Sequence, residues 1–302
     1  MTGVLLIDKP SGPTSHDVVA RIRRVSGERS IGHTGTLDPR ATGLLPLVLG
    51  RATRLASYVT SGDKTYEAVI RLGFATDTDD ADGEPTGPAQ PTTAAAEPAA
   101  VEAALTSFRG TFDQLPPNHS AKKVAGQRAY ELARQAKPVA LTPVSVTVRE
   151  LVRIAVPAGA DAADIIRVRV RATAGFYVRA LARDLGERLG CGAHLAELRR
   201  TRCEPFDVSE ALPLAEAERL GLALEARLLA PAEALPHLPA VRVTEPGLVR
   251  VRHGNAIGPD LVAGPLPPAS APGPVRLLTG DGHLVALAHS RGGALHPVVV
   301  LG

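Results

Sequence analysis

The sequence predicts a mixed α/β (α+β) protein that has a central mixed β-sheet and ends in a small β-rich module. Of its 302 residues, 44% are hydrophobic and 22% are charged, a composition typical of globular proteins. Through the first two thirds, segments with the alternation of strands are interspersed with segments of helical periodicity. After Pro236 the pattern changes to short valine-rich strands separated by Gly and Pro. We therefore place a boundary between a unit at residues 1–237 and a module at residues 238–302.

The first elements are predicted from short apolar patterns. Residues 4–7 form a buried strand, and Ser15 then caps a helix with apolar residues on one face. Residues 32–50 are rich in Gly, Thr and Pro, which predicts a loop leading into a short element. Alternation over residues 64–73 predicts the next strand.

The second half of the larger unit begins with a Pro-, Thr- and Ala-rich surface loop at residues 85–98. A helix is predicted at residues 101–108, strands at 144–154 and 165–173, a helix at 176–189, and further helices over 212–235. Residues 165–173 place arginines on one face, which meets either solvent or RNA. The C-terminal module carries a Pro/Gly insertion at residues 264–274.

Charge is unevenly distributed along a chain whose net charge is only +3. Residues 75–104 contain seven acids and no Lys or Arg, whereas residues 121–202 contain sixteen Lys or Arg and seven acids. The basic segment is equally consistent with a phosphate-binding surface and with a solvated basic face. Asp8 and Lys9 interrupt the first apolar segment, and no run approaches about 18 apolar residues, so we expect a cytoplasmic protein without a membrane span.

Two common nucleotide-binding motifs are absent from the glycine-rich segment 32–46. It has no Gly-Lys-Ser/Thr ending, as a phosphate-binding P-loop requires, and no Gly-x-Gly start, as a dinucleotide fingerprint requires. On the pattern alone, Asp38-Pro39 is most simply a turn. The acidic run at residues 76–83 fails as a calcium loop, because aligning Gly83 puts Thr78 first and Ala89 last. Two cysteines that lie far apart indicate buried thiols and no metal site.

Segment 32–46, Gly-His-Thr-Gly-Thr-Leu-Asp-Pro-Arg-Ala-Thr-Gly-Leu-Leu-Pro, closely resembles the signature of the TruB-type tRNA pseudouridine-55 synthases. In that family the Asp of Gly-x-Leu-Asp-Pro is catalytic, which implies this role for Asp38. The chemistry fits, because exchanging a glycosidic C–N bond for a C–C bond needs a carboxylate that acts as nucleophile or base. The residues leave the choice between these two roles open.

Further motifs follow in the order expected for the family. The resemblance implies active-site support by Tyr66 in Lys-x-Tyr, by Asp80 in the acidic run, and by Tyr177 and Arg179 in Gly-x-Tyr-x-Arg, with Leu198 lining the uracil pocket. An arginine paired with Asp38 would keep that carboxylate ionised at neutral pH.

The resemblance also implies how the RNA is held. RNA contacts are implied for Lys9 in the opening Lys-Pro motif, for His33, which would fill the space left by the extruded base, and for Lys123. Lys123 lies in a segment, at about residues 114–143, similar to the family's tRNA-clamping segment, and residues 238–302 resemble an RNA-binding module of PUA type. The implied enzyme has the pseudouridine synthase fold, isomerises uridine-55 in the tRNA T-loop without cofactor or metal, and acts as a monomer without a protein partner.

Three other functions remain open at this stage. A guide-RNA-dependent synthase of the dyskerin type shares the core motifs. A non-catalytic tRNA-binding or tRNA-folding protein could use the same RNA surface. A small-molecule nucleotide enzyme is the least supported, because both phosphate-binding loops are missing.

Overall fold

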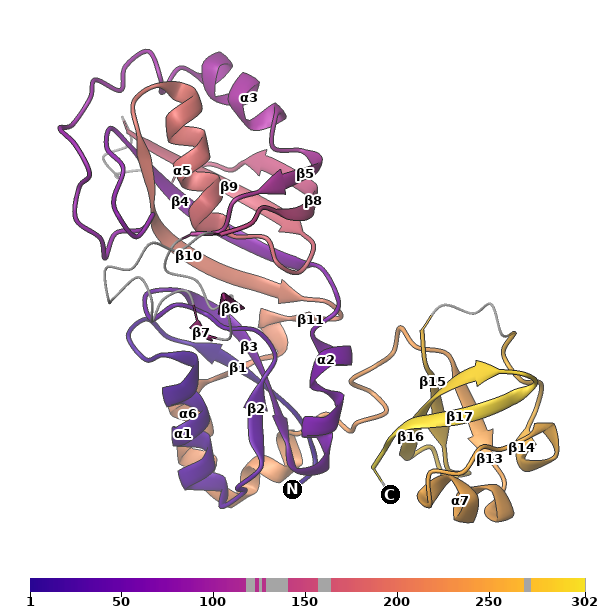
Figure 1. The fold of residues 1–302 in the computed structure, drawn as a ribbon. Coiled ribbons are helices and arrows are strands. Elements are labelled where there is room, and N and C mark those ends of the chain that lie inside the picture. Colours follow the sequence, from indigo (N-terminus) through magenta and orange to yellow (C-terminus); the bar gives the residue numbers. More distant parts are fainter. Residues whose placement is uncertain (118–122, 125–126, 129–140, 157–163, 269–272, 302) are drawn as a thin grey trace.

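The computed structural model describes residues 1–117, 123–124, 127–128, 141–156, 164–268 and 273–301. Within them the chain forms a large mixed sheet and a smaller C-terminal sheet (Figure 1). The large sheet has the order β12-β1-β3-β10-β4-β9-β8-β5, with β2 paired to β3 and β11 to β10. Its strands are β1 (Gly3–Lys9), β2 (Ile31–His33), β3 (Thr42–Leu49), β4 (Lys64–Leu72), β5 (Gly110–Gln114), β8 (Val144–Arg153), β9 (Ile165–Ala172), β10 (Ala193–Cys203), β11 (Phe206–Asp207) and β12 (Leu212–Pro213). The predicted central mixed sheet is confirmed.

Helices α1 (Ser15–Ser26) and α5 (Val178–Leu189) cover the same face of this sheet, one on each half. Apolar residues of α1 pack on β1 and β3, and those of α5 pack on β4 and β9. Leu198 of β10 packs against both clusters, so it marks the line where the two halves meet. The other helices of the described residues are α2 (Ala56–Val59), α3 (Pro98–Thr106), α6 (Leu214–Leu220), η1 (Gly50–Leu55), η2 (Val208–Glu210), η3 (Gly221–Arg227), and, in the C-terminal part, α7 (Glu245–Arg252) and η4 (Pro259–Leu261).

The first correction concerns β3, which lies inside the segment predicted to be mostly loop. Its eight residues are almost all buried, and it pairs with β1 over its whole length. Pro46 is accommodated because its carbonyl oxygen accepts a 3.0 Å hydrogen bond from Thr34 N, so the side of Pro46 that lacks an N–H faces Thr34 and no donor to β1 is lost. Gly and Pro therefore lie within a central strand here. The continuous apolar run indicates this strand more reliably than Gly and Pro indicate a loop.

Three helix predictions also need correction. The residue that caps α1 is Thr14, not Ser15, because Thr14 Oγ1 accepts a 3.0 Å hydrogen bond from Asp17 N in a reciprocal capping box. The predicted helix 101–108 runs instead over Pro98–Thr106. Residues 212–235 are not continuously helical, because α6 ends at Gly221, whose φ of 55° breaks the helix.

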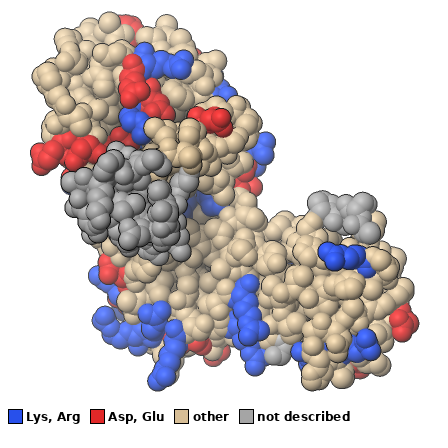
Figure 2. Space-filling view, viewed as in Figure 1, with Lys and Arg blue, Asp and Glu red and all other residues tan. Residues whose placement is uncertain are grey.

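The arginines of β9 form ion pairs with acids in or next to β4. Arg167 and Arg169 lie 3.6 and 3.7 Å from the two carboxylate oxygens of Glu67, and Arg171 Nε lies 3.2 Å from Asp63. On the face drawn in Figure 2, Lys and Arg gather near α1 and on the C-terminal part, while Asp and Glu gather on the upper part. The arginines of β9 are therefore held in ion pairs with acids of the same protein.

The C-terminal part forms its own five-stranded sheet in the order β14-β13-β15-β16-β17, which confirms a small β module. Its apolar side chains Leu284, Leu287 and Leu301 pack into the same core as β1 and β3 of the large sheet. Arg51 and Arg54 of η1 donate hydrogen bonds to the carbonyl oxygens of Leu301 and Val300, at 2.8 and 2.7 Å. The strands are β13 (Ala240–Val243), β14 (Val262–Ala263), β15 (Val275–Leu278), β16 (Leu284–Arg291) and β17 (Ala294–Val300).

Most of segment 114–143, including residues 118–122 and 129–140, lies outside the described residues. The backbone of Lys123 lies in β6 (Lys123–Val124), which pairs with β7 (Gln127–Arg128). None of the helices in the described ranges is long and apolar enough to cross a membrane.

Candidate active site

Asp38 lies in the loop between β2 and β3, and both of its neighbours are fixed. Leu37 N donates a 2.9 Å hydrogen bond to Ser15 Oγ at the start of α1. The carbonyl oxygen of Pro39 accepts hydrogen bonds from Gly12 N and Lys9 Nζ, both at 2.9 Å. Hydrogen bonds therefore fix the backbone on both sides of Asp38.

Lys9 holds this loop from inside the protein, and the prediction that it contacts RNA is wrong. Its side chain is 0% exposed. Its ammonium donates to the carbonyl oxygens of Pro10, Pro13 and Pro39 at 2.8 to 2.9 Å. Burial lowers the pKa of Lys9 to about 8, although the nearby Asp38 carboxylate acts in the opposite direction.

Arg179, at the N-terminal end of α5, joins Asp38 to Asp80. Its Nε lies 3.1 Å from Asp38 Oδ2 and its Nη1 lies 3.5 Å from Asp80 Oδ2. Nη1 also donates a 3.2 Å hydrogen bond to the carbonyl oxygen of Thr78. The side chain of Arg179 is only 8% exposed, compared with 42% for Asp38. The structure therefore brings together the three residues that the sequence predicted for one carboxylate network.

The pKa of Asp38 is raised above its ordinary value. Burial of the carboxyl group is the largest cause. Arg179 and Lys9 lower the pKa, while Asp80 and Asp82 raise it. The carboxyl group thus binds a proton more readily than an ordinary aspartate does.

Asp38 and Arg179 open onto a pocket of about 270 Å³ between the two halves of the sheet. Tyr66 of β4, Tyr177 at the start of α5 and Leu198 of β10 also line it, as predicted. Burial raises the pKa of the Tyr66 hydroxyl, so this side chain stays neutral. The pocket combines these apolar and aromatic side chains with the Asp38 carboxylate, which suits a flat, uncharged ring.

Two further cations line the pocket and were not predicted as site residues, Arg200 and Lys64. Arg200 is 2% exposed and donates to the carbonyl oxygens of Leu44 and Gly35, at 2.8 and 3.1 Å. Gly43 leaves room for this strand, because a Cβ there would lie 2.2 Å from the Arg200 carbonyl oxygen. The Arg-Arg-Thr run at residues 199–201 is the sequence feature that could have indicated Arg200. Sequence alone, however, does not show which of the two arginines points inward.

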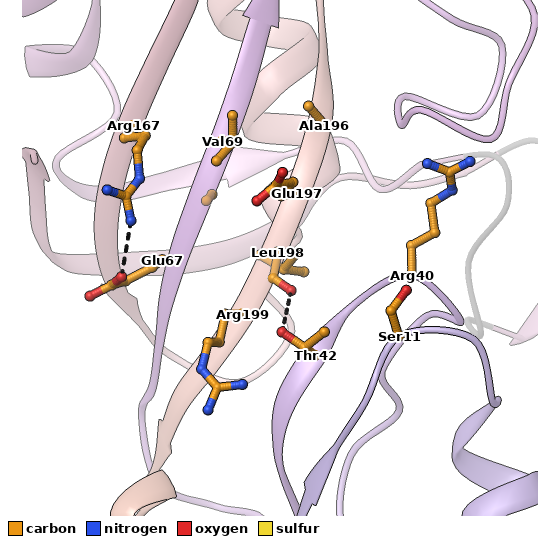
Figure 3. A pocket seen from close by; sticks show the side chains of 11 residues that line it. Ser11, Arg40, Thr42, Glu67, Val69, Arg167, Ala196, Glu197, Leu198 and Arg199 are labelled. Carbon is orange, nitrogen blue, oxygen red and sulfur yellow. Dashed lines mark hydrogen bonds and ion pairs between the residues drawn. The ribbon is translucent and has the colours of Figure 1, made fainter. Parts of the chain in front are cut away.

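A larger groove of about 620 Å³ lies on the opposite face of the sheet (Figure 3). Arg167 is paired there with Glu67, and Arg199 forms two hydrogen bonds with Asp8 at 3.0 and 2.8 Å. Asp38 does not line this groove. We therefore assign the chemistry to the smaller pocket, where the network around Asp38 is exposed.

Two further residues that the sequence predicts to contact RNA are His33 and Lys123. His33 ends β2, and its ring meets that of His16 edge-on, with centroids 5.2 Å apart. It lies outside the residues that line the pocket. The side chain of Lys123 lies outside the described part of the chain. Among the described residues, no group of three or more His, Cys, Asp or Glu could hold a metal ion.

Comparison with known families decides the identity. Residues 23–178 match the model of the TruB family pseudouridylate synthase N-terminal domain, and residues 179–235 match the tRNA pseudouridylate synthase B C-terminal domain. The chain belongs to the TruB family of pseudouridylate synthases. This membership makes it an isomerase and confirms the family predicted from the sequence.

Curated TruB relatives are similar over the whole chain. The tRNA pseudouridine synthase B of Solibacter usitatus (strain Ellin6076) is 44% identical over 306 residues, covering 100% of both chains. That of Thermobifida fusca (strain YX) is 45% identical, covering 99% of this chain and 98% of the relative. A chain in a Cbf5-Nop10-Gar1 complex is 27% identical, with a TM-score of 0.73, and the match covers 100% of this chain and 85% of that one. The pseudouridine synthase fold is thus confirmed.

Proposed function

We propose that this TruB protein converts uridine-55 in the T-loop of tRNA to pseudouridine, with Asp38 as the catalytic carboxylate. The carrying observation is the half-buried carboxylate of Asp38, held 3.1 Å from Arg179 in a pocket that Tyr66, Tyr177 and Leu198 also line. The pocket volume of about 270 Å³ is below the usual range for drug-sized ligands, about 300 to 1,000 Å³, and is consistent with one extruded nucleobase. The names of the relatives support tRNA as the substrate.

The reaction breaks the bond from ribose C1′ to uracil N1 and forms one from C1′ to C5. N1 gains a proton and C5 loses one, so no oxidant or reductant is consumed. An ionised Asp38 can begin this either as a nucleophile at the sugar or as a base. We assign Arg179 and Asp80 to holding the carboxylate, and Tyr66, Tyr177 and Leu198 to packing on the base. None of these roles requires a cofactor or metal.

The rest of the chain is assigned to RNA binding. We propose that residues 1–237 form the catalytic domain and residues 238–302 a PUA-like RNA-binding module. His33, which lies half-buried at the end of β2, and Lys123, in the segment at about residues 114–143, are proposed to contact the T-arm. We further propose a monomer that acts without a partner protein.

The test is site-mapped pseudouridine formation by the purified protein on unmodified tRNA transcript, with no guide RNA and no other protein. Modification at uridine-55 supports both the substrate and the independence from partners. The similarity to a chain in a Cbf5-Nop10-Gar1 complex favours the alternative of an enzyme that works with partner proteins, as a guide-dependent synthase would. Modification that appears only when a guide RNA and partner proteins are added would replace our proposal with that one.

A further inference from the structure

The turn that carries Asp80 is attached to α5 at two points. Arg179 holds Asp80 and the Thr78 carbonyl oxygen, as described above. One helical turn further on, Arg183 Nη1 lies 3.1 Å from Asp79 Oδ2. Residues four apart lie on one side of a helix, so Arg179 and Arg183 of α5 bind two consecutive aspartates, Asp80 and Asp79 respectively.

Asp79 is an unusual residue on its own account. Its φ of 62° makes it the one non-glycine residue with a left-handed backbone among the described residues. It is 8% exposed, and burial raises its pKa while Arg183 acts in the opposite direction. A buried carboxylate in a sparsely populated conformation persists only where its surroundings compensate for both costs. Arg183, only 19% exposed itself, provides that compensation.

The backbone of this turn is docked on β10 beside the pocket. Leu195 N donates to the Asp79 carbonyl oxygen, and Ala81 N donates to the Leu195 carbonyl oxygen, both at 3.0 Å. Thr78 Oγ1 and Asp82 N bind Asp80 Oδ1, so Oδ2 is the oxygen that faces Arg179. A movement of the turn would therefore carry Asp80 away from Arg179.

Arg183 is also tied to its surroundings. Its Nη2 donates a 2.9 Å hydrogen bond to the Leu115 carbonyl oxygen, and its Nε donates a 2.8 Å hydrogen bond to Asp184. It does not line the pocket that contains Asp38. Any effect of Arg183 on the reaction must accordingly pass through the groups that it holds.

We propose that Arg183 is a positioning residue for the isomerisation, which fixes the turn at residues 76–83 through Asp79 and so orients Asp80 and Arg179 against Asp38. The inference rests on the proposed function, since it assigns Arg183 to the same reaction. No sequence pattern in the chain indicated this role, because the paired residues are 104 positions apart.

The test compares Arg183→Gln, Arg183→Lys and Asp79→Asn with the wild type. Single-turnover rates at saturating tRNA, tRNA affinity and the melting temperature are measured for each. We expect Arg183→Gln and Asp79→Asn each to slow the reaction about tenfold with unchanged affinity, and the double variant to be no slower than either. Arg183→Lys should recover most of the rate. Arg188→Gln is the matched control on the same helix, where Arg188 is exposed and stacks over Phe108.

A second readout does not depend on activity. The titration of the Asp38 carboxyl, followed by ¹³C NMR, senses the charged groups that face it, namely Arg179, Asp80, Lys9 and Asp82. In Arg183→Gln we expect Asp38 to titrate at lower pH than in the wild type, because the released turn carries Asp80, whose charge raises the pKa of Asp38, away from it. Arg188→Gln should leave the titration unchanged.

The proposal fails if Arg183→Gln leaves both the rate and the Asp38 titration at wild-type values. It also fails if the rate falls only in proportion to lost folded protein or lost tRNA affinity. A wild type that forms no pseudouridine would refute the proposed function, whereas the NMR titration would still decide the role of Arg183.

Discussion

Replacing Arg179 with glutamine is expected to move the acid limb of the pH–rate profile to higher pH. Arg179 Nε lies 3.1 Å from Asp38 Oδ2, and its charge lowers the pKa of that carboxyl, whereas burial and Asp80 raise it. Glutamine keeps a hydrogen-bonding side chain but removes the charge, so only the smaller contribution of Lys9 still lowers the pKa.

The size of the change follows from the exposure of Asp38. An adjacent arginine lowers the pKa of an aspartate by about one to three. Because 42% of the Asp38 side chain is exposed, water screens the interaction, and we expect the lower end, a shift of about one pH unit. The reactive form is the carboxylate, so the rate is lost as pH falls through the pKa. A higher pKa therefore means that this loss begins at higher pH, with about tenfold less activity on the acid limb.

The assay is the single-turnover rate of pseudouridine formation on tRNA transcript at a series of acid and neutral pH values. Asp80→Asn is the matched control, because Asp80 raises the pKa of Asp38 and its neutralisation should move the acid limb to lower pH. An acid limb that stays in place in Arg179→Gln, or moves in the same direction in both variants, would refute the electrostatic reasoning.

Three smaller predictions test the fold around the site. Thr14→Ala removes the capping box of α1 and should lower the free energy of unfolding by about 1 kcal/mol in denaturant titrations; no change would mean that the cap is redundant. Gly43→Ala should destabilise the protein by about 3 kcal/mol in the same assay, since φ there is 100° and the new Cβ would meet the Arg200 carbonyl oxygen at 2.2 Å. Arg167→Gln should change tRNA affinity less than twofold in a filter-binding assay, because Arg167 is paired with Glu67 within the protein; a large loss would show that β9 binds RNA.

The site residues that the sequence predicts are those that lie in continuous motifs. Asp38, Tyr66, Asp80, Tyr177, Arg179 and Leu198 were all named from such motifs, and the structure gathers all of them around one pocket or its Arg179 network. Lys9 was named from a motif too, but a motif does not report burial. Its three carbonyl contacts show that this lysine holds the loop that carries Asp38.

What escaped prediction depends on contacts between distant strands. The β9 arginines look like an RNA surface until the register shows Glu67 opposite Arg169 and within 3.6 Å of Arg167 as well. The sequence predicts a loop at β3, because Gly and Pro are typical of loops. The structure shows instead that the apolar run of this segment forms a strand buried on both faces. The Arg183–Asp79 pair joins two otherwise unremarkable charges, and only the fold brings them together.

The most direct test of the central claim compares wild type with Asp38→Asn on unmodified tRNA transcript, with pseudouridine mapped by site and tRNA binding measured in parallel. Asparagine preserves the shape of the side chain but removes the carboxylate. We predict modification of uridine-55 by the wild type and none by Asp38→Asn, with tRNA binding retained by both. Pseudouridine formation by Asp38→Asn at the wild-type rate would contradict the account.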